Sequence, residues 1–374
     1  MIEMTKNKFF VYITLTFVGV LIGFLFGGIN IISSTYSKPF GNPGDPVPLR
    51  KVSVPRYGSK IGNSKIIIPA SKDNSSKRTI PTTKGEFQSA GTMTAQNITK
   101  IIILTYRRSG SSFFAELFKQ NPNIFYMFEP LKAVVERYDI DTPVAGPAFL
   151  KEIMNCRFSG NSYLSQVTSM HGWRWQAIFR NVKILNDVPK VCVDSDIVAS
   201  KIIRLANIGQ IAPYFGKDTA ILFLARDPRG ILNSRNHETR SYKNLALELK
   251  KKDMESLCYN SLTNINFIKD LKAKRKELDL KPLIKQVIYE DFAYDTLTNA
   301  QKLYKALDIP FHQSVRYWIG KNTSTFSGGT YGTSRNSTSI PTKWMVQLSP
   351  VELNMIQNIT DCREVIQSLG FKIQ

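Results

Sequence analysis

Residues 101–120 read IIILTYRRSGSSFFAELFKQ, which is a β-branched run, a turn of small polar residues and then a helical pattern. The run that ends at Thr105 predicts a short buried strand. The segment after the turn repeats apolar residues at helical spacing, at Phe114, Leu117 and Phe118. A helix that begins directly after such a turn can bind an anion, because its first N–H groups and its dipole face the ligand. An ordinary βα turn with a serine cap is the alternative.

The same alternation of strand and helix recurs along the chain. Apolar runs predict strands at residues 124–128, 200–205, 220–225 and 286–289, and helical patterns occupy residues 205–214, 245–278, 296–307 and 350–369. Strands that alternate with helices predict an α/β fold, with a central parallel sheet flanked by helices. Ligands of such sheets bind at the carboxyl ends of the strands.

A second basic strand end lies at residues 222–235, LFLARDPRGILNSR. Arg226 ends the strand, and Ser234 follows eight residues later in the next helix. A guanidinium, a hydroxyl and helical N–H groups together favour a second phosphate site. A surface loop with an ion pair through Asp227 is the alternative. Two basic strand ends in one domain fit a donor with two separated anionic groups.

The first loop differs from that of a nucleotide kinase. Such a loop reads G-x-x-x-x-G-K-[ST], with its lysine on the phosphates and its hydroxyl on magnesium. Here no glycine stands five residues before Gly110, and Ser111 occupies the lysine position. The difference suits a donor whose terminal group is monoanionic and needs no magnesium, so we expect no metal site.

The N-terminal region carries a candidate membrane anchor. Residues 9–32, FFVYITLTFVGVLIGFLFGGINII, contain no charged residue and would span roughly 36 Å as a helix. A retained anchor fits better than a cleaved signal peptide, because the run is long and no small-x-small site follows it. We expect a cytoplasmic tail over residues 1–8, a transmembrane helix over 9–32, a flexible luminal stem over 33–96 and a catalytic domain over 97–374.

Sequons and cysteines are consistent with a luminal domain. The pattern N-x-[ST] occurs after the anchor at Asn74, Asn97, Asn322, Asn336 and Asn358. Cysteines stand at positions 156, 192, 258 and 362, with no CxxC and no zinc spacing. In an oxidising lumen they would form two disulfides in one of three pairings, and four reduced core cysteines are the alternative.

The charge of the chain bounds its partners. A net charge of +21 and a pI near 9.7 attract polyanions, which include nucleic acid, anionic lipid and acidic polysaccharide. The basic residues are dispersed and show no zinc-finger, helix-turn-helix or RNP pattern, so we expect no nucleic-acid partner.

The two basic strand ends resemble those of a known family. The loop that begins at Thr105 resembles the 5′-phosphosulfate loop of the carbohydrate 6-O-sulfotransferases that act on galactose, N-acetylgalactosamine and N-acetylglucosamine. The segment from Arg226 to Ser234 resembles their 3′-phosphate motif. The resemblance continues in order through QNPNIFYMFEPL (120–131), YEDFA (289–293), GTSRNS (332–337) with the Lys343-Trp344 pair, and the segment from Cys362 to Phe371. It departs at Arg107, where the family often has tryptophan.

The resemblance implies a P-loop-like sulfotransferase fold and a donor, 3′-phosphoadenosine-5′-phosphosulfate (PAPS). Arg226 and Ser234 would bind the 3′-phosphate, and Arg335 would reach the donor from the C-terminal loop. The residues that would bind the 5′-phosphosulfate are Arg107, Arg108, Ser109, Gly110, Ser111, Ser112 and Phe113.

Arg108 and Glu129 are the implied catalytic residues. Glu129 follows the second strand and matches the acidic residue of the family pattern, so we expect it to be the general base for the acceptor hydroxyl. A structural carboxylate paired with Arg107 or Arg108 is the alternative, and His237 is then the next candidate base.

Taken together, these expectations describe a single-pass type II enzyme of the Golgi membrane. It would transfer a sulfuryl group from PAPS to the 6-hydroxyl of Gal, GalNAc or GlcNAc in a glycan or glycosaminoglycan. The alternative is a membrane-tethered luminal glycan-binding protein without catalysis. The sequence leaves open whether the chain forms a homo-oligomer.

Overall fold

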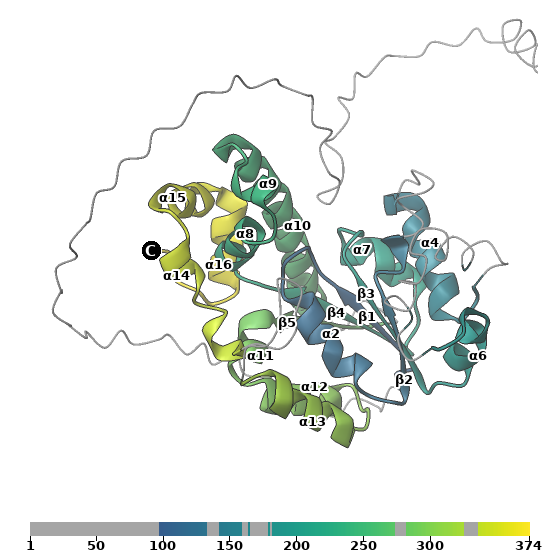
Figure 1. The fold of residues 1–374 in the computed structure, drawn as a ribbon. Coiled ribbons are helices and arrows are strands. Elements are labelled where there is room, and N and C mark those ends of the chain that lie inside the picture. Colours follow the sequence, from purple (N-terminus) through teal and green to yellow (C-terminus); the bar gives the residue numbers. More distant parts are fainter. Residues whose placement is uncertain are drawn as a thin grey trace, which may run out of the picture. The chain divides into compact units, whose positions relative to one another are not determined.

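The computed structural model describes residues 97–132, 142–158, 164, 179, 182–273, 282–324 and 336–374. At its centre lies a five-stranded sheet in the order β2-β3-β1-β4-β5 (Figure 1). The strands are β1 Lys100–Leu104, β2 Ile124–Phe128, β3 Ile197–Ile202, β4 Thr219–Ala225 and β5 Leu283–Ile288. All four pairings are parallel, with Ile102 opposite Ser200 on one side and Ile221 on the other. The predicted parallel α/β sheet is confirmed.

Helices follow most strands. They are α2 Ser111–Lys119, α4 Thr142–Met154, α6 Val188–Val193, α7 Ile208–Ile211, α8 Pro228–Asn236, α9 Arg240–Lys243, α10 Leu247–Ala273, α11 Tyr289–Tyr294, α12 Thr296–Ala306, α13 Gln313–Asn322, α14 Trp344–Gln347, α15 Pro350–Asn358 and α16 Thr360–Ser368. Short 3₁₀ turns occupy η2 Leu185–Asp187, η3 Ala212–Tyr214 and η4 Ser337–Ser339.

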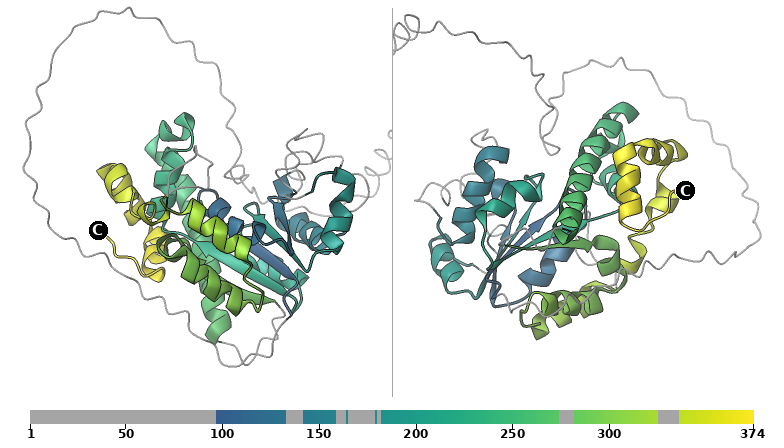
Figure 2. Two further views of the ribbon diagram at one scale, coloured as in Figure 1. Left: turned by 60° about the horizontal axis from the view of Figure 1, so that its bottom comes forward. Right: turned by 180° about the vertical axis from the view of Figure 1, so that it is seen from behind.

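The sheet is buried on both faces. Successive side chains of β1 point to opposite faces of the sheet, and each set enters its own apolar cluster. Ile101 and Ile103 enter one apolar cluster with residues of α2, α11, α12 and α13. Ile102 and Leu104 enter a second cluster with residues of α4, α6, α7, α10 and α16. Figure 2 shows these two helical layers on either side of the strands. A third cluster joins α8, α10, α15 and α16.

Two disulfides fix one of the three pairings that the sequence left open. Cys156 pairs with Cys192, and Cys258 pairs with Cys362. The second bond links α10 to α16 within the third apolar cluster. The alternative of four reduced cysteines is therefore wrong.

Several predicted elements have different bounds in the structure. The strand predicted at 286–289 is β5, Leu283–Ile288, and Tyr289 already begins α11. The helix predicted at 350–369 is two helices, because Ile359 has extended backbone angles between α15 and α16. The strand predicted at 200–205 is β3, which begins earlier, at Ile197, and ends earlier, at Ile202. The helix predicted at 205–214 is reduced to α7 and η3.

The predicted cytoplasmic tail (1–8), transmembrane helix (9–32) and stem (33–96) lie outside the described residues. Within the part of the chain that is described, no helix has the length and apolar content to cross a membrane. These three predictions therefore remain untested.

Candidate functional site

The chain reverses its direction across the sheet between β1 and β4. The connection after β1 runs past β3 to β2, and the connection after β4 runs the other way to β5. Loops that leave adjacent strands in opposite directions open a crevice at their carboxyl ends, where ligands of α/β proteins bind. The two basic strand ends predicted from the sequence are these two loops.

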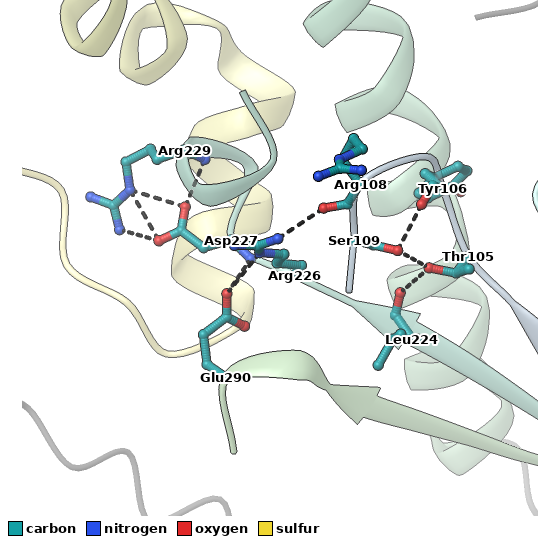
Figure 3. Close-up of polar contacts among 9 residues, drawn as sticks. All are labelled: Thr105, Tyr106, Arg108, Ser109, Leu224, Arg226, Asp227, Arg229 and Glu290. Carbon is teal, nitrogen blue, oxygen red and sulfur yellow. Dashed lines mark hydrogen bonds and ion pairs between the residues drawn. The ribbon is translucent and has the colours of Figure 1, made fainter. Parts of the chain in front are cut away.

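Hydrogen bonds within the β1–α2 loop hold it against β4. The Ser109 hydroxyl donates to the carbonyl of Tyr106 (2.7 Å) and shares a short hydrogen bond with Thr105 (Figure 3). The Thr105 hydroxyl also lies 3.0 Å from the carbonyl of Leu224 in β4, and its single hydrogen can be donated either to that carbonyl or to Ser109. Thr105 and Ser109 are fully buried, so the Ser109 hydroxyl shapes the loop.

Gly110 lets the helix begin directly at the loop. Its φ of +86° is left-handed, and it is the N-cap of α2. A Cβ at this position would lie 2.1 Å from Cε2 of Tyr289, so no larger residue fits. The first N–H groups of α2, at Ser111 and Ser112, have no acceptor inside the helix and are suited to an anion.

Phe113 has a different environment from the one predicted. Its N–H donates to the Gly110 carbonyl (3.1 Å), and its ring packs near Tyr289 and Trp318, with centroids 6.5 and 5.8 Å away. Its side chain is buried in the core. The contacts of Phe113 are those of a packing residue, and its predicted contact with the donor remains untested.

Arg108 connects the two loops. The residue has a left-handed backbone (φ 69°), and its Nε donates to the Ser234 hydroxyl in α8 (3.1 Å). The backbone carbonyl of Arg108 accepts a hydrogen bond from Nη1 of Arg226 (2.9 Å). The structure thus brings together Arg108, Arg226 and Ser234, which the sequence assigned to two separate anion sites.

Arg226 is almost fully buried at the end of β4. Its guanidinium lies over the ring of Tyr289 (4.5 Å), and its Nε lies 3.9 Å from a Glu290 carboxylate oxygen. Gly230 makes room for it, since a Cβ there would lie 3.1 Å from that Nε. Within the described residues, Nε of Arg226 has no hydrogen-bond partner.

Asp227 does not form the surface ion pair of the alternative reading. It is buried, caps α8 through the N–H of Arg229 (2.9 Å) and accepts three further bonds from Nε and Nη2 of the Arg229 guanidinium. Arg229 also stacks on Trp344 (4.0 Å) and donates to the Lys372 carbonyl (2.9 Å). This pair fastens the C-terminal segment to α8. The ion pair through Asp227 that the alternative predicted is therefore present, but it is buried and does not lie in a surface loop.

The side chain of Arg107 contacts other residues of the protein. Its Nη1 pairs with Glu238 (3.4 Å), and its guanidinium lies 5.8 Å from the Tyr242 ring centroid. Its carbonyl accepts a long bond from Arg235 (3.4 Å), which is itself paired with Asp253 (2.5 Å). The contacts of Arg107 are structural, and its predicted part in donor binding remains untested.

Glu129 is held by two cations that the sequence did not identify. Lys201 Nζ lies 2.5 Å from one carboxylate oxygen, and Arg204 Nη1 lies 2.7 Å from the other. Burial by itself would raise the pKa of Glu129, but the charges and hydrogen bonds of Lys201 and Arg204 outweigh it and lower that pKa. The partners are therefore neither Arg107 nor Arg108, and the carboxylate stays ionised at neutral pH.

The cationic partners of Glu129 come from β3 and the turn that follows it. Lys201 is 2% exposed and also lies over the Phe128 ring (3.8 Å). A lysine inside an apolar run was the only signal in the sequence for this cluster. Burial is the largest cause of the lowered pKa of Lys201, and Glu129 acts against it.

The other predicted residues are placed as follows. His237, the next candidate base, is exposed, and its Nδ1 lies 2.8 Å from the Asn233 carbonyl. Arg335 lies outside the described residues. Over the described ranges, no group of three or more His, Cys, Asp or Glu side chains is arranged to hold a metal ion.

Glu290 is a site residue that sequence reasoning missed. It begins α11 beside Tyr289, is 3% exposed and accepts the N–H of Asp227 (3.1 Å). Burial raises its pKa to about 8, while Arg226 acts to lower that pKa and Asp227 to raise it. In the sequence, Glu290 was only part of the YEDFA segment.

Comparisons with known proteins identify the family of the chain. The family model described as "Sulfotransferase domain" matches residues 98–361, more than half of the chain. Human carbohydrate sulfotransferase 1 is 25% identical over 339 residues, which cover 74% of this chain and 80% of that protein. Rat carbohydrate sulfotransferase 3 is 26% identical over 337 residues, with 76% and 70% covered. A solved sulfotransferase domain from the Synechococcus PCC 7002 olefin synthase has 14% identity and a TM-score of 0.43, and covers 75% of this chain and 97% of that one. By the family match, this chain belongs to the sulfotransferase domain family.

Proposed function

We propose that this sulfotransferase transfers a sulfuryl group from PAPS to a carbohydrate hydroxyl, most specifically the 6-hydroxyl of Gal, GalNAc or GlcNAc in a glycan or glycosaminoglycan. The observation that carries the proposal is the contact between Arg108 and Ser234 at the carboxyl ends of β1 and β4. It places a loop suited to a phosphosulfate next to a motif suited to a phosphate. The names of the curated relatives support a carbohydrate acceptor.

The residues present fit a donor with two anionic ends. The N-terminus of α2 offers N–H groups at Ser111 and Ser112, and Gly110 lets the helix begin at the loop with the Tyr289 ring packed directly against it. On the other side, Arg226 retains an Nε with no hydrogen-bond partner among the described residues, and its Nη1 donates to the carbonyl of Arg108, whose side chain meets the Ser234 hydroxyl. PAPS, when bound, supplies the sulfuryl group and a leaving phosphate that is already a stable anion.

Four residues of the site have a specific role in this proposal. Arg108 stabilises the negative charge on the transferring group, and Arg226 and Ser234 bind the 3′-phosphate. Glu129 accepts the proton of the acceptor hydroxyl, for which one of its ion pairs with Lys201 or Arg204 must open. The remaining predicted donor contacts, at Arg107, Ser109, Phe113 and Arg335, belong to the same proposal.

The 3′-phosphate assignment is tested by ligand selectivity. Loss of a charged contact in a buried site costs on the order of 2–4 kcal/mol. Arg226→Ala should therefore weaken binding of adenosine 3′,5′-bisphosphate (PAP) far more than binding of adenosine 5′-phosphate, as measured by calorimetry. Arg316→Ala, at an exposed arginine of α13, should leave both unchanged. Equal losses for the two ligands would exclude the assignment.

The reaction itself is tested by transfer. The full chain, incubated with ³⁵S-labelled PAPS and a panel of glycans, should label a subset of acceptors that carry a free primary hydroxyl. Binding of glycans without any transfer, and without PAP binding, would favour the alternative of a membrane-tethered glycan-binding protein.

We also propose that the chain is a single-pass type II protein of the Golgi membrane, with a tail at 1–8, an anchor at 9–32, a stem at 33–96 and a luminal catalytic domain at 97–374. The two disulfides support an oxidising compartment for that domain. Expressed in animal cells, the chain should lose mass on N-glycosidase treatment. A protein with no occupied sequon and a C-terminus open to protease in intact microsomes would exclude this topology.

A further inference from the structure

Glu290 is a buried carboxyl group with no part in the reaction as described so far. Its oxygen Oε1 accepts the N–H of Asp227 and lies 3.9 Å from Nε of Arg226, a distance too long for a hydrogen bond. In the described part of the chain, the other oxygen of Glu290 and the Nε of Arg226 have no hydrogen-bond partner. Unpaired buried polar atoms are rare and call for an explanation.

Contacts run from this carboxyl group to both anion-binding loops. Glu290 on α11 faces Arg226 after β4, and Arg226 donates to the carbonyl of Arg108 after β1 (Figure 3). The side chain of Arg108 then donates to Ser234 on α8. One guanidinium, that of Arg226, thus lies between Glu290 and the loop of Arg108.

The charges around Glu290 are few among the described residues. The β4–α8 turn contributes Arg226 and Asp227, and the charge of Asp227 is compensated by Arg229. The helix α11 itself contributes Asp291 and Tyr294, and the adjacent η4 turn (Ser337–Ser339) contributes no charge. Arg226 is thus the cation to which the state of Glu290 is coupled.

We propose that Glu290 is a positioning residue of the donor site, which orients Arg226 against the Arg108 loop and takes up a proton when a phosphate binds at Arg226. The inference rests on the proposed function, since it assumes a phosphate at Arg226. The proton comes from solvent and binds a carboxylate oxygen of Glu290, and no covalent bond to the ligand forms.

The sign of the linkage follows from Coulomb repulsion. A phosphate beside Arg226 brings negative charge toward the Glu290 carboxylate, which favours its neutral form. Burial already raises the pKa of Glu290 to about 8 in the ligand-free protein. Below pH 8 the group is therefore mostly neutral and binding takes up little proton. Above pH 8 it is mostly ionised, and each binding event must protonate it.

The expected effect on affinity can be stated as a fold-change. A phosphate monoester has its second pKa near 6, so the ligand does not titrate between pH 7 and 9. Over that range PAP affinity should fall by about tenfold, because only about a tenth of the free protein holds a neutral Glu290 at pH 9. The same titration should show close to one proton taken up per PAP at pH 9.

The test is calorimetry of PAP binding to the full chain in detergent, at pH 7 and pH 9, in two buffers of different ionisation enthalpy. Glu290→Gln mimics the neutral acid and should bind as the unaltered chain does at pH 7, with no proton uptake and no loss of affinity at pH 9. Glu290→Ala should bind more weakly than Glu290→Gln at both pH values, since both variants lack the charge and only the alanine loses the orienting contact with Arg226. Asp291→Asn removes the same charge one residue later and should behave as the unaltered chain.

Two results would overturn the inference. One is PAP binding by the unaltered chain without proton uptake at pH 9, which needs no variant and is independent of folding. The other is uptake that persists in Glu290→Gln. Absence of PAP binding by the unaltered chain would instead reject the proposed donor.

Proton binding by Glu290 can also be tested without ligand, from the pH dependence of the melting temperature. The neutral Glu290 carboxyl group contributes its full stability to the folded chain below pH 4.3, which is about the pKa of a glutamate in the unfolded chain. That contribution is lost as the pH rises to about 8, the pKa of Glu290 in the folded chain. The melting temperature of Glu290→Gln minus that of the unaltered chain should therefore increase from pH 5 to pH 8 and change little above it. A difference independent of pH would exclude the proposed proton binding.

Discussion

Gly110→Ala is expected to damage the donor site through two separable effects. The first is backbone strain, because Gly110 has a φ of +86°, and an L-residue in the left-handed region loses roughly 1–2 kcal/mol. The second is a collision, because the new Cβ would lie 2.1 Å from Cε2 of Tyr289. Ordinary carbon contacts are about 3.5–4.0 Å, and overpacking of a core typically costs about 1–3 kcal/mol.

The sum is a loss of about 2–5 kcal/mol in the free energy of unfolding, a large part of the roughly 5–15 kcal/mol that a domain possesses. The ring of Tyr289 cannot yield without cost, since it is buried, packs near Phe113 and lies under the guanidinium of Arg226 at 4.5 Å. Displacement of the ring would disturb Arg226. We therefore expect PAP affinity to fall at least tenfold in the folded fraction.

The assay is denaturant unfolding of four chains that form a double-mutant cycle: unaltered, Gly110→Ala, Tyr289→Ala and the pair. Without the Tyr289 ring, Gly110→Ala should cost only the strain of about 1–2 kcal/mol. Gly209→Ala is the control, because its Cβ would meet Phe267 at an ordinary 3.7 Å. If Gly110→Ala costs the same with and without the Tyr289 ring, the collision is not the cause and the reasoning fails.

Three further substitutions test other parts of the structure. Glu129→Gln should lower turnover by about 10²–10⁴-fold with PAP affinity nearly unchanged. Because the pKa of Glu129 is lowered in the folded chain, the stability that its charge contributes is lost as pH falls below about 4.3. The stability of the variant should therefore be less sensitive to acid than that of the unaltered chain. If Glu129→Gln abolishes PAP binding instead, the carboxylate is structural. Arg229→Met leaves the buried charge of Asp227 unpaired and should cost about 3–5 kcal/mol in unfolding experiments, more than the double change with Asp227→Asn. Cys258→Ser with Cys362→Ser removes the bond that closes the longer loop and should cost about 2–5 kcal/mol; an unchanged melting temperature would show that α16 does not depend on it.

Local signals made much of the fold predictable. The strands at β1, β2 and β4 are apolar runs whose pattern is visible in a few residues, and the capping box of Ser349 and Glu352 marks the start of α15. The left-handed position of Gly110 follows from the same kind of signal, since glycine between a strand and a helix favours that backbone. The break at Ile359 carries no such residue, so the single helix predicted there was wrong.

Partners of buried charges could not be predicted, because they lie far apart in the sequence. Glu129 pairs with Lys201 and Arg204, more than seventy residues later, although Arg107 and Arg108 are nearer in the chain. A lysine buried inside β3 contradicts the usual exposure of lysine.

The three arginines of the second motif differ in how their guanidinium groups are satisfied, and this difference separates structure from binding. Arg229 has the Asp227 carboxylate at 2.8 Å, and Arg235 has its own carboxylate at 2.5 Å. Among the described residues, Arg226 has no hydrogen bond to a carboxylate, because its acid lies 3.9 Å away and carries a raised pKa. A phosphate can therefore bind Arg226 without first displacing a strong partner, whereas at the other two it would have to break an ion pair. Loss of Arg229 or Arg235 should thus reduce stability first, and loss of Arg226 should reduce donor binding first.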